Sequence, residues 1–317
     1  MNRLVTIGIP VYNGARFFEE CLESVVSQTY SDLEILIVDD GSIDDSLKIA
    51  EDYQSRYDFI KIIRNEKNLG LVGNWNKCLS LSNGDWVKLH FQDDLMEPET
   101  IEKMIQMSID YDLNLVLTDR EFFYEDEIKD QFVGYKKLSH LYDDVTIIFP
   151  EELASLLIRL GLNDNFLGEP IIGLVKKELL MRYGFYDDLF EHLVDFEYWL
   201  RISLNERVGF IPEALHKFRI HEGSKGSLNV HTKNEIVSIP DHDKMKLIHK
   251  LANDVYFERF RESVSKRQID KLIKTNIVRK VAKKGYHKMS TILEPHLLSY
   301  VRKNKVDWIK SHIRDFF

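Results

Sequence analysis

Apolar residues fall along the first 120 residues of the chain in two alternating patterns. Short runs rich in Val, Ile and Leu predict buried strands at residues 5–11, 33–38, 59–63, 86–89 and 113–118. Between these runs, apolar residues recur at helical spacing and predict helices at residues 15–28, 44–57, 72–81 and 98–109. This alternation is typical of an α/β fold with a mostly parallel central sheet flanked by helices.

The rest of the chain is less regular. Residues 120–150 are rich in charged and aromatic side chains without a clear period, and we interpret them as an irregular insert beside a site. Further helices are predicted at 150–160, 177–183 and 196–204, a strand at 171–175, and paired strand segments at 208–220 around Pro212. We therefore predict a body over residues 1–232, with halves at 1–119 and 120–232, and a helical C-terminal region over residues 233–317.

The composition is that of a folded globular protein. Of the 317 residues, 44% are hydrophobic and 30% are charged, which excludes fibrous, low-complexity and disordered classes. Cys21 and Cys78 cannot make a disulfide framework or a cysteine zinc site, and we expect them to be reduced core residues. No apolar run approaches the roughly 18 residues that cross a bilayer, and no leader precedes the first strand, so we expect a cytoplasmic protein.

The formal charge of −9 is unevenly distributed along the chain. Residues 1–240 carry a net charge of −19 and residues 241–317 a net charge of +10, so we expect a basic tail attracted to an anionic surface. In this tail Ile269, Leu272, Ile273 and Ile277 share one helical face, with basic residues opposite. Two interpretations stay open: this face lies in a membrane interface, or it packs on the body of the protein or on a second subunit.

Polar clusters follow four of the predicted strands. They are PVYNG at 10–14, DDGS at 39–42, NLG at 68–70 and QDD at 92–94. Ligands of open α/β sheets bind at the carboxyl ends of the strands, so these clusters predict a binding site there. Asp93 and Asp94 offer hard oxygen ligands for Mg²⁺ or Mn²⁺, which could bridge to a diphosphate; the alternative is a solvated acidic turn.

The nucleotide fingerprints of other α/β folds are absent. No Gly-x-Gly-x-x-Gly follows the first strand and no Gly-Lys-Ser/Thr phosphate loop occurs, which disfavours a dinucleotide oxidoreductase and a P-loop NTPase. A nucleotidyltransferase would need basic residues near the first strand to bind a triphosphate, and Arg16 alone stands there.

Five motifs together resemble the family 2 glycosyltransferases of the GT-A fold. The resemblance covers roughly residues 4–227 and rests on TIGIPVYNG (6–14), VDDGSIDDS (38–46), NLGLVGNWN (68–76), FQDDLMEP (91–98) and DFEYWLR (195–201). It implies transfer of a sugar from a nucleoside-diphosphate donor to an acceptor hydroxyl. It also implies inversion at the anomeric carbon and a divalent metal, Mn²⁺ or Mg²⁺, on the diphosphate.

The resemblance also implies a donor site. Pro10 and Tyr12 would shape the base pocket, with Tyr12 stacked on uracil or thymine, and Asp39 would accept the N3–H of the base. Asn68 and Gly70 match the family motif. Asp40 is expected either to share this site or to cap the turn with Gly41 and Ser42.

Two of the motifs depart from the family pattern. Asn74, Trp75 and Asn76 stand where the family often has Ala-Arg-Asn, which removes a cation near the nucleotide. Gln92 stands where the family has the first carboxylate of Asp-x-Asp-Asp. Of Asp93 and Asp94, one would bind the metal and the other would hydrogen-bond the donor ribose or sugar.

The segment 216–227 resembles a family loop that carries Arg-x-His. His221 would join the metal or contact the diphosphate, and Arg219 or Lys225 would neutralise phosphate charge. The alternative for His221 is a solvated loop residue.

The resemblance assigns the catalytic base to Asp195, because an acceptor hydroxyl needs a carboxylate to take its proton. Val194 replaces the usual Glu, and Glu197 keeps the later acid. Asp195 could instead, or in addition, cap the helix predicted at 196–204.

From the sequence we expect an inverting, metal-dependent glycosyltransferase that uses a UDP- or dTDP-sugar. Its acceptor would be a glycan or lipid-linked glycan of a surface polysaccharide, reached at the inner face of the cell membrane. A homodimer stays open and no nucleic-acid partner is expected. The alternative is a catalytically impaired sugar-nucleotide-binding or scaffold subunit, which the missing arginine and carboxylate would suit.

Overall fold

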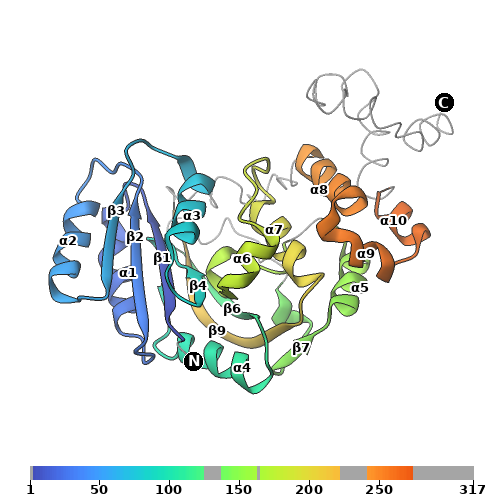
Figure 1. Ribbon diagram of the computed structural model, residues 1–317, viewed down its shortest axis with the longest axis horizontal. Helices are drawn as coiled ribbons and strands as arrows, with labels where there is room; N and C mark the ends of the chain where they lie inside the picture. Colours follow the sequence, from blue (N-terminus) through green and yellow to red (C-terminus); the bar gives the residue numbers. More distant parts are fainter. Residues whose placement is uncertain (1–2, 125–136, 163–164, 222–240, 274–317) are drawn as a thin grey trace.

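A computed structural model describes residues 3–124, 137–162, 165–221 and 241–273 (Figure 1). The first half of the chain forms a parallel sheet in the order β3-β2-β1-β4. Its strands and helices alternate as β1 (Val5–Val11), α1 (Ala15–Val26), β2 (Leu33–Asp39), α2 (Ser46–Arg56), β3 (Ile60–Arg64), α3 (Gly70–Leu81) and β4 (Trp86–Leu89). All seven residues of β1 are buried, as expected of a strand that is covered on both faces.

The second half of the sheet is mixed. It continues as β4-β8-β6-β9-β5, with β7 paired to β9; β8 is antiparallel to both of its neighbours, whereas β6 and β9 are parallel. Its strands are β5 (Leu95–Met96), β6 (Leu115–Tyr124), β7 (Thr146–Ile148), β8 (Gly173–Lys176) and β9 (Val208–Ile220). The predicted α/β fold with a central sheet flanked by helices is confirmed. Three of its parallel strand pairings lie in the first half of the sheet, and a fourth joins β6 and β9.

The remaining helices connect these strands or follow them. They are α4 (Thr100–Asp110), α5 (Pro150–Leu160), α6 (Lys177–Tyr183), α7 (Val194–Ser203), α8 (Asp241–Asn253), α9 (Glu258–Ser263) and α10 (Lys266–Ile273), with the short 3-10 helices η2 (Leu138–His140), η3 (Pro170–Ile172) and η5 (Val255–Phe257).

The prediction of paired strand segments around Pro212 is wrong. Residues 208–220 form one strand, β9, whose pairing with β6 shifts from Thr118↔Ile211 to Asp119↔Ala214. Pro212 has no N–H to donate to the ladder, and the strand accommodates it by a bulge instead of ending. The predicted insert is also more regular than expected, because β6 runs to Tyr124 and β7 pairs with the start of β9.

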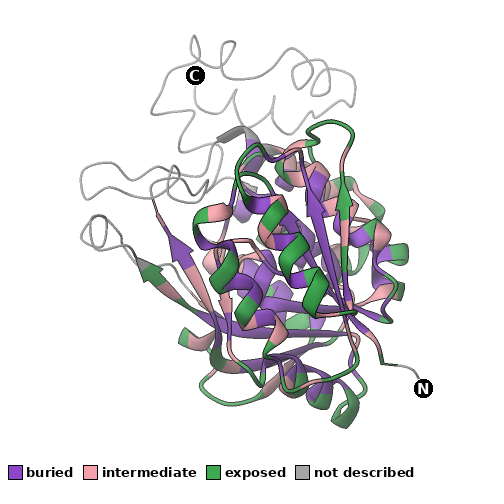
Figure 2. Ribbon diagram, turned by 90° about the vertical axis from the view of Figure 1, so that its left-hand side faces the viewer, coloured by how far each residue is buried: buried purple, intermediate pink, exposed green. Residues whose placement is uncertain are grey.

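Two hydrophobic clusters fill the two faces of the sheet. One lies under α1, α2 and α4, and the other under α3, α5, α6 and α7. Cys21 and Cys78 are buried and free, one in each cluster, as predicted. In Figure 2 the central strands are mostly buried while the helices in front of them have exposed outer faces.

Helices α8 to α10 pack on the body of the protein, beside α5 (Figure 1). Leu247, Leu251, Phe257 and Phe260 are buried in the same cluster as Trp199 of α7. Leu272 of the predicted apolar face is also buried there, which favours packing on the body for this part of the tail; Ile277 lies outside the described residues. Within the described part of the chain, no helix is long and apolar enough to span a bilayer.

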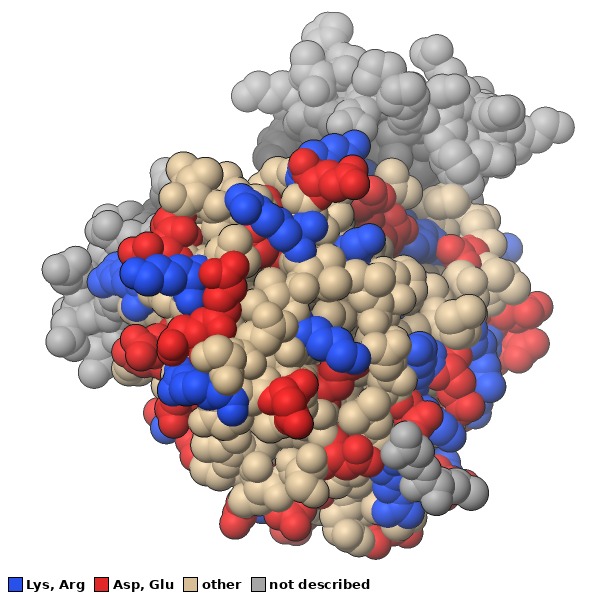
Figure 3. All heavy atoms as spheres, turned by 60° about the vertical axis from the view of Figure 1, so that its left-hand side comes forward, with Lys and Arg blue, Asp and Glu red and all other residues tan. Residues whose placement is uncertain are grey.

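Acidic and basic side chains are interspersed over the face shown in Figure 3. The net charge of residues 1–240 therefore does not form a patch of one sign on this face.

Candidate functional site

The loops after β1 and β2 are tied together by side-chain hydrogen bonds. Asn13, whose φ is +49°, accepts the N–H of Ile43 at 2.9 Å and donates its own N–H to Ser42 Oγ at 3.0 Å. Gly14 donates its N–H to Ser46 Oγ at 2.8 Å. These bonds join two loops that lie about 30 residues apart in the chain.

Tyr12 is held by its backbone and leaves its ring half exposed. Its N–H donates to Gln92 Oε1 at 2.8 Å, and Gln92 Nε2 donates back to the Tyr12 carbonyl at 3.3 Å. The Tyr12 side chain is 50% exposed, whereas Pro10 is buried in β1. The amide of Gln92 therefore fixes the position from which Tyr12 could stack on a base.

Gly14 gives Gln92 the space for this contact. A Cβ built on Gly14 would lie 2.3 Å from Gln92 Cδ. The sequence shows only that Gln92 stands where the family pattern has a carboxylate. The pairing with Tyr12 could not be predicted, although an amide, unlike a carboxylate, can both donate and accept.

The two aspartates after β2 hydrogen-bond different parts of the backbone. Asp39, which is 1% exposed, accepts the N–H of Ser42 at 3.1 Å and lies 3.5 Å from Arg64 Nε. Asp39 therefore caps the turn, and the prediction that Asp40 caps it with Gly41 and Ser42 is wrong. The backbone turns so that the Asp40 carboxylate faces the next loop.

Asp40 holds the loop that begins α3. Its carboxylate accepts the N–H groups of Leu69 at 2.8 Å and Gly70 at 3.0 Å. Asn68 accepts the N–H of Gly70 at 2.9 Å, and Gly70 has a φ of +74°, which favours glycine. A Cβ on Gly70 would meet nothing within 4 Å, so the structure requires this glycine for its backbone angle.

The residues that replace Ala-Arg-Asn in the family motif pack within the fold. Asn74 donates to the Val38 carbonyl at 3.0 Å, and Trp75 stacks on Phe91 with ring centroids 5.1 Å apart. Asn76 pairs with the backbone of Tyr186 through hydrogen bonds of 2.9 and 3.0 Å. The residues at these three positions are therefore held by contacts within the fold.

Three of the predicted metal and donor residues meet at the edge of the sheet. Asp93 and Asp94 lie between β4 and β5, and His221 follows β9; His221 Nε2 lies 3.0 Å from Asp93 Oδ2. Asp94 Oδ1 accepts the N–H of Arg219 at 2.8 Å, while its buried Oδ2 has no hydrogen-bond partner among the described residues. Burial and the neighbouring Asp93 raise the pKa of Asp94 well above its usual value.

These residues fit a divalent cation that takes most of its ligands from elsewhere. The described residues hold no group of three or more His, Cys, Asp or Glu side chains arranged around a metal position. They do hold the Asp93 and His221 contact and the unpartnered oxygen of Asp94. A cation bound there would complete its shell with diphosphate oxygens and water, as suits Mg²⁺ or Mn²⁺.

Arg219 is engaged by the protein. Its guanidinium lies between the rings of Phe17 and Phe123, at 4.4 and 4.6 Å from their centroids. It contacts Glu20 Oε2 at 2.5 Å and donates to the Asp93 carbonyl at 2.9 Å. The structure thus gives Arg219 a role in holding the loop of Asp93; Lys225, the alternative cation, lies outside the described residues.

Asp195 lies in the first turn of α7. The N-cap of this helix is Leu193, so the alternative in which Asp195 is the cap is wrong, because the helix begins at Val194, two residues earlier than predicted. Asp195 Oδ1 accepts the N–H of Phe196 at 2.7 Å. Burial, with a smaller contribution from the charge of Glu169, raises the pKa of Asp195 to about 7.

Glu197, the later acid of the same motif, is poorly placed to act as the base instead of Asp195. It is fully buried, and its carboxylate contacts Arg201 Nη2 at 2.9 Å and Lys250 Nζ at 2.7 Å. Two cations therefore hold it in the core of the protein.

Glu169 is a site residue that sequence analysis missed. Its charge acts on both Asp94 and Asp195, which places it near both of them. Its Oε2 lies 2.6 Å from Nε of the buried Arg120. Glu169 follows no strand, so the argument from strand ends could not find it; the available signal was the Gly-Glu-Pro triplet before β8.

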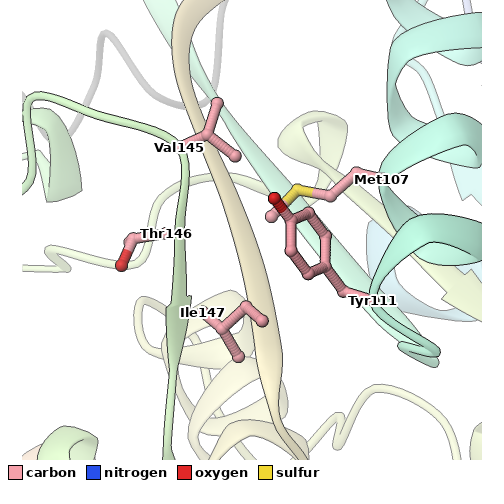
Figure 4. A pocket seen from close by; sticks show the side chains of 5 residues that line it. All are labelled: Met107, Tyr111, Val145, Thr146 and Ile147. Atoms are coloured by element: carbon pink, nitrogen blue, oxygen red, sulfur yellow. The ribbon is translucent and has the colours of Figure 1, made fainter.

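A shallow apolar pocket lies at the other end of β9 from this site. Figure 4 shows its lining side chains, Met107 and Tyr111 of α4 and Val145, Thr146 and Ile147 around β7. Because β7 pairs with residues 208–210 at the start of β9, this pocket is separate from the acidic residues at the end of that strand.

The first half of the chain matches a known sequence family. The family model described as "Glycosyl transferase family 2" matches residues 6–148. An uncharacterised protein of Mycobacterium tuberculosis is 29% identical over 218 residues, which are 67% of this chain and 66% of that protein. An uncharacterised glycosyltransferase of Haemophilus influenzae is 25% identical over 327 aligned positions, covering 99% of this chain and 92% of the relative.

Comparison with solved structures identifies the fold. TarS of S. aureus, residues 1–349 in complex with UDP-GlcNAc, has a TM-score of 0.66 at 17% identity, covering 92% of this chain and 78% of that one. The mannosyltransferase PcManGT of Pyrobaculum calidifontis, in complex with GDP-Man and Mn²⁺, has a TM-score of 0.51 at 16% identity, covering 96% and 87%. Residues 6–148 of this chain are thus similar to the family 2 glycosyltransferases, and its fold is that of the GT-A glycosyltransferase structures.

Proposed function

We propose that the protein transfers a sugar, with inversion, from a UDP- or dTDP-sugar to a hydroxyl of a glycan or lipid-linked glycan acceptor in surface polysaccharide synthesis. The observation that carries this proposal is that Glu169 lies near both Asp195 and Asp94. Burial and the charge of Glu169 raise the pKa of Asp195 to about 7, and the charge of Glu169 also acts on Asp94, whose neighbour Asp93 contacts His221. Inverting sugar transfer needs a base for the acceptor hydroxyl and a site that holds the leaving diphosphate, and these two groups of residues would supply them.

Asp195 would take the proton of the acceptor hydroxyl. A base with a pKa near the working pH is both deprotonated and able to accept a proton, so burial suits Asp195 to this role. Tyr12 and Asp39 would bind the base, and Asn68 and Gly70 would line the donor site. Asp93, Asp94 and His221 would hold Mn²⁺ or Mg²⁺, which when bound supplies positive charge for the leaving diphosphate.

The nature of the donor draws support from the structural neighbours. TarS is bound to UDP-GlcNAc, and the mannosyltransferase to GDP-Man and Mn²⁺. We favour a uracil or thymine base because Asp39, after β2, matches the family aspartate for the N3–H. We also expect action at the inner membrane face, with the basic residues after 273 as the candidate contact.

The alternative, an impaired binding or scaffold subunit, is less well supported. Its basis was the loss of a carboxylate at Gln92 and of a cation at Trp75. Gln92 hydrogen-bonds the backbone of Tyr12 and Trp75 stacks on Phe91, so these departures have structural explanations. Asp94 and Asp195 are both retained.

The test of the proposal is Asp195→Asn. The amide keeps the shape of the side chain and cannot accept the proton, so turnover should fall by about 10² to 10⁴ while donor affinity is unchanged. Turnover is measured as UDP release from a panel of UDP-sugars with Mn²⁺. Asp188→Asn, an exposed change on the preceding loop, is the matched control. More than about a tenth of wild-type turnover in Asp195→Asn would contradict the assignment.

The donor is identified separately by thermal shift. UDP-, dTDP- and GDP-sugars are compared with and without Mn²⁺, and the preferred donor at 100 times its Kd should add about 2.7 kcal/mol of stability. Preference for a GDP-sugar would contradict the choice of base.

A further inference from the structure

Helix α8 reaches back to the segment that enters α7. Asp243 of α8 is fully buried, and its Oδ2 accepts three successive backbone N–H groups, those of Glu191 at 3.0 Å, His192 at 2.7 Å and Leu193 at 3.2 Å. The partners lie about 50 residues away in the chain. One carboxylate oxygen therefore binds the backbone of a whole short segment.

This segment ends at the N-cap of α7. Leu193 is the N-cap residue, and its side chain makes no capping hydrogen bond. The first N–H groups of a helix have no partner within it, and an anion near them is favourable. Asp243 supplies a carboxylate to the residues that enter the helix, and Asp195 follows the last of them by two positions.

Two lysines of α8 bind the same region. Lys250 Nζ lies 2.7 Å from Asp187 Oδ2 and 2.7 Å from Glu197 Oε1, and Lys246 Nζ donates to the Leu189 carbonyl at 2.5 Å. Together with Asp243, these contacts hold α7 on both sides of Asp195 in sequence. Helix α8 is thus bonded to the turn that presents the proposed base.

We propose that Asp243 is a positioning residue for sugar transfer, which fixes the backbone of residues 191–193 and so aims the Asp195 carboxylate at the acceptor hydroxyl. This inference rests on the proposed function, in which Asp195 is the base. A misplacement of a reacting group by about 1 Å can cost about 10²-fold in rate, so loss of these three hydrogen bonds should reduce turnover without touching the donor site.

The experiment compares full-length wild type, Asp243→Asn, Asp243→Ala and the control Leu251→Ala. Leu251 is a buried residue of the same helix in the hydrophobic cluster, so its truncation loosens α8 while leaving the carboxylate in place. UDP release from the preferred UDP-sugar with Mn²⁺ gives kcat, and calorimetry gives the donor Kd. Hydrogen exchange of the peptide covering 191–196 reports the segment directly.

The expected result is a graded loss of kcat, by about tenfold in Asp243→Asn and about 10²-fold in Asp243→Ala, with donor Kd unchanged. Exchange of residues 191–196 should quicken in both variants and less in Leu251→Ala, whose kcat should stay near wild type below its melting temperature. Asp243→Asn preserves the side-chain shape, so it remains informative if Asp243→Ala does not fold.

Three outcomes would overturn the inference: retained kcat in both Asp243 variants, an equal kcat loss in Leu251→Ala, or a donor Kd that weakens with kcat. Asp195→Asn, run in parallel, separates this failure from that of the proposed function. If Asp195→Asn turns over like wild type, the base assignment fails. If Asp195→Asn is inactive while the Asp243 variants are active, the positioning role alone fails.

Discussion

Asp195 differs from an ordinary surface aspartate because it is partly buried and shares its surroundings with another acid. Burial and the charge of Glu169 disfavour its ionised form, while the N–H of Phe196 and the side chain of Asn165 favour it. The balance raises the pKa of Asp195 to about 7. At this scale, a carboxylate becomes a base suited to neutral pH through its neighbours.

The first prediction concerns the pH dependence of turnover. Asp195 must be deprotonated to act, so turnover should rise with pH through about 7. Glu169→Gln removes a like charge and should lower the pKa of Asp195, moving this rise to lower pH. Initial rates between pH 5 and 9 measure the midpoint, with the exposed Glu178→Gln as control. A midpoint that stays in place or moves upward would rule out the electrostatic link.

The second prediction concerns the proposed metal site. Asp93→Ala or His221→Ala removes one member of the closest acidic and imidazole pair, whose atoms lie 3.0 Å apart. Binding of UDP in Mn²⁺ should weaken by about 10- to 100-fold, and binding in EDTA should hardly change. Calorimetry measures both, with Lys217→Ala as a nearby control whose side chain forms an ion pair with Glu97. If wild type binds UDP equally well in EDTA and in Mn²⁺, no metal is needed.

At the scale of elements, the site depends on loops that bind one another. Gln92 bonds the loop after β1, and Asp40 bonds the loop before α3. The register of β1 with β2, which pairs Val11 with Asp39, brings these loops to one edge of the sheet. The strands place these loops at one edge of the sheet, and side chains of one loop hydrogen-bond the backbone of another.

The third prediction tests this bonding through Asp40. Asp40→Ala leaves the N–H groups of Leu69 and Gly70 without their acceptor, and hydrogen bonds to a charged group contribute about 1.5 to 3 kcal/mol each. We expect the free energy of unfolding in urea to fall by roughly 3 kcal/mol and donor binding to weaken. The control is Asp45→Ala, because Asp45 makes no side-chain capping bond to α2. Similar losses in both variants would contradict this role for Asp40.

At the scale of the whole molecule, the C-terminal helices share the core of the catalytic domain. Phe257 and Phe260 are buried in the cluster that holds Trp199, and Lys250 contacts the buried Glu197. The tail up to Ile273 is therefore part of the folded unit, and the membrane contact that we propose would fall to the residues beyond it.

The fourth prediction separates these two parts of the tail. A chain ending at residue 240 exposes apolar side chains whose burial stabilises the fold by about 1.5 to 3 kcal/mol each, so it should melt far below the full chain or aggregate. A chain ending at residue 273 should keep its melting temperature but lose salt-sensitive co-sedimentation with anionic vesicles. Circular dichroism, light scattering and sedimentation read these outcomes. If the chain that ends at residue 273 still binds vesicles as the full chain does, a membrane role for residues 274–317 is excluded.

The sequence by itself determined the alternation of strands and helices and, to within one residue, the positions at which β1, β2, β3 and β4 end. These features are local, because burial imposes a period of two or 3.6 on the residues of one segment. The edge at which Asp93, Asp94 and Tyr12 gather follows from the same alternation, since parallel strands end on one side. The resemblance to a family motif then pointed to Asp195.

Only the tertiary structure decided which atoms meet. The bond from Gln92 to Tyr12 spans 80 residues and that from Asp243 to His192 spans 51, so no local pattern encodes either. Which of Asp39 and Asp40 accepts the N–H groups of the turn depends on the way the backbone turns after β2. Glu169 and Asp243 act through space on groups distant in sequence, and their partners become known only when the chain has packed.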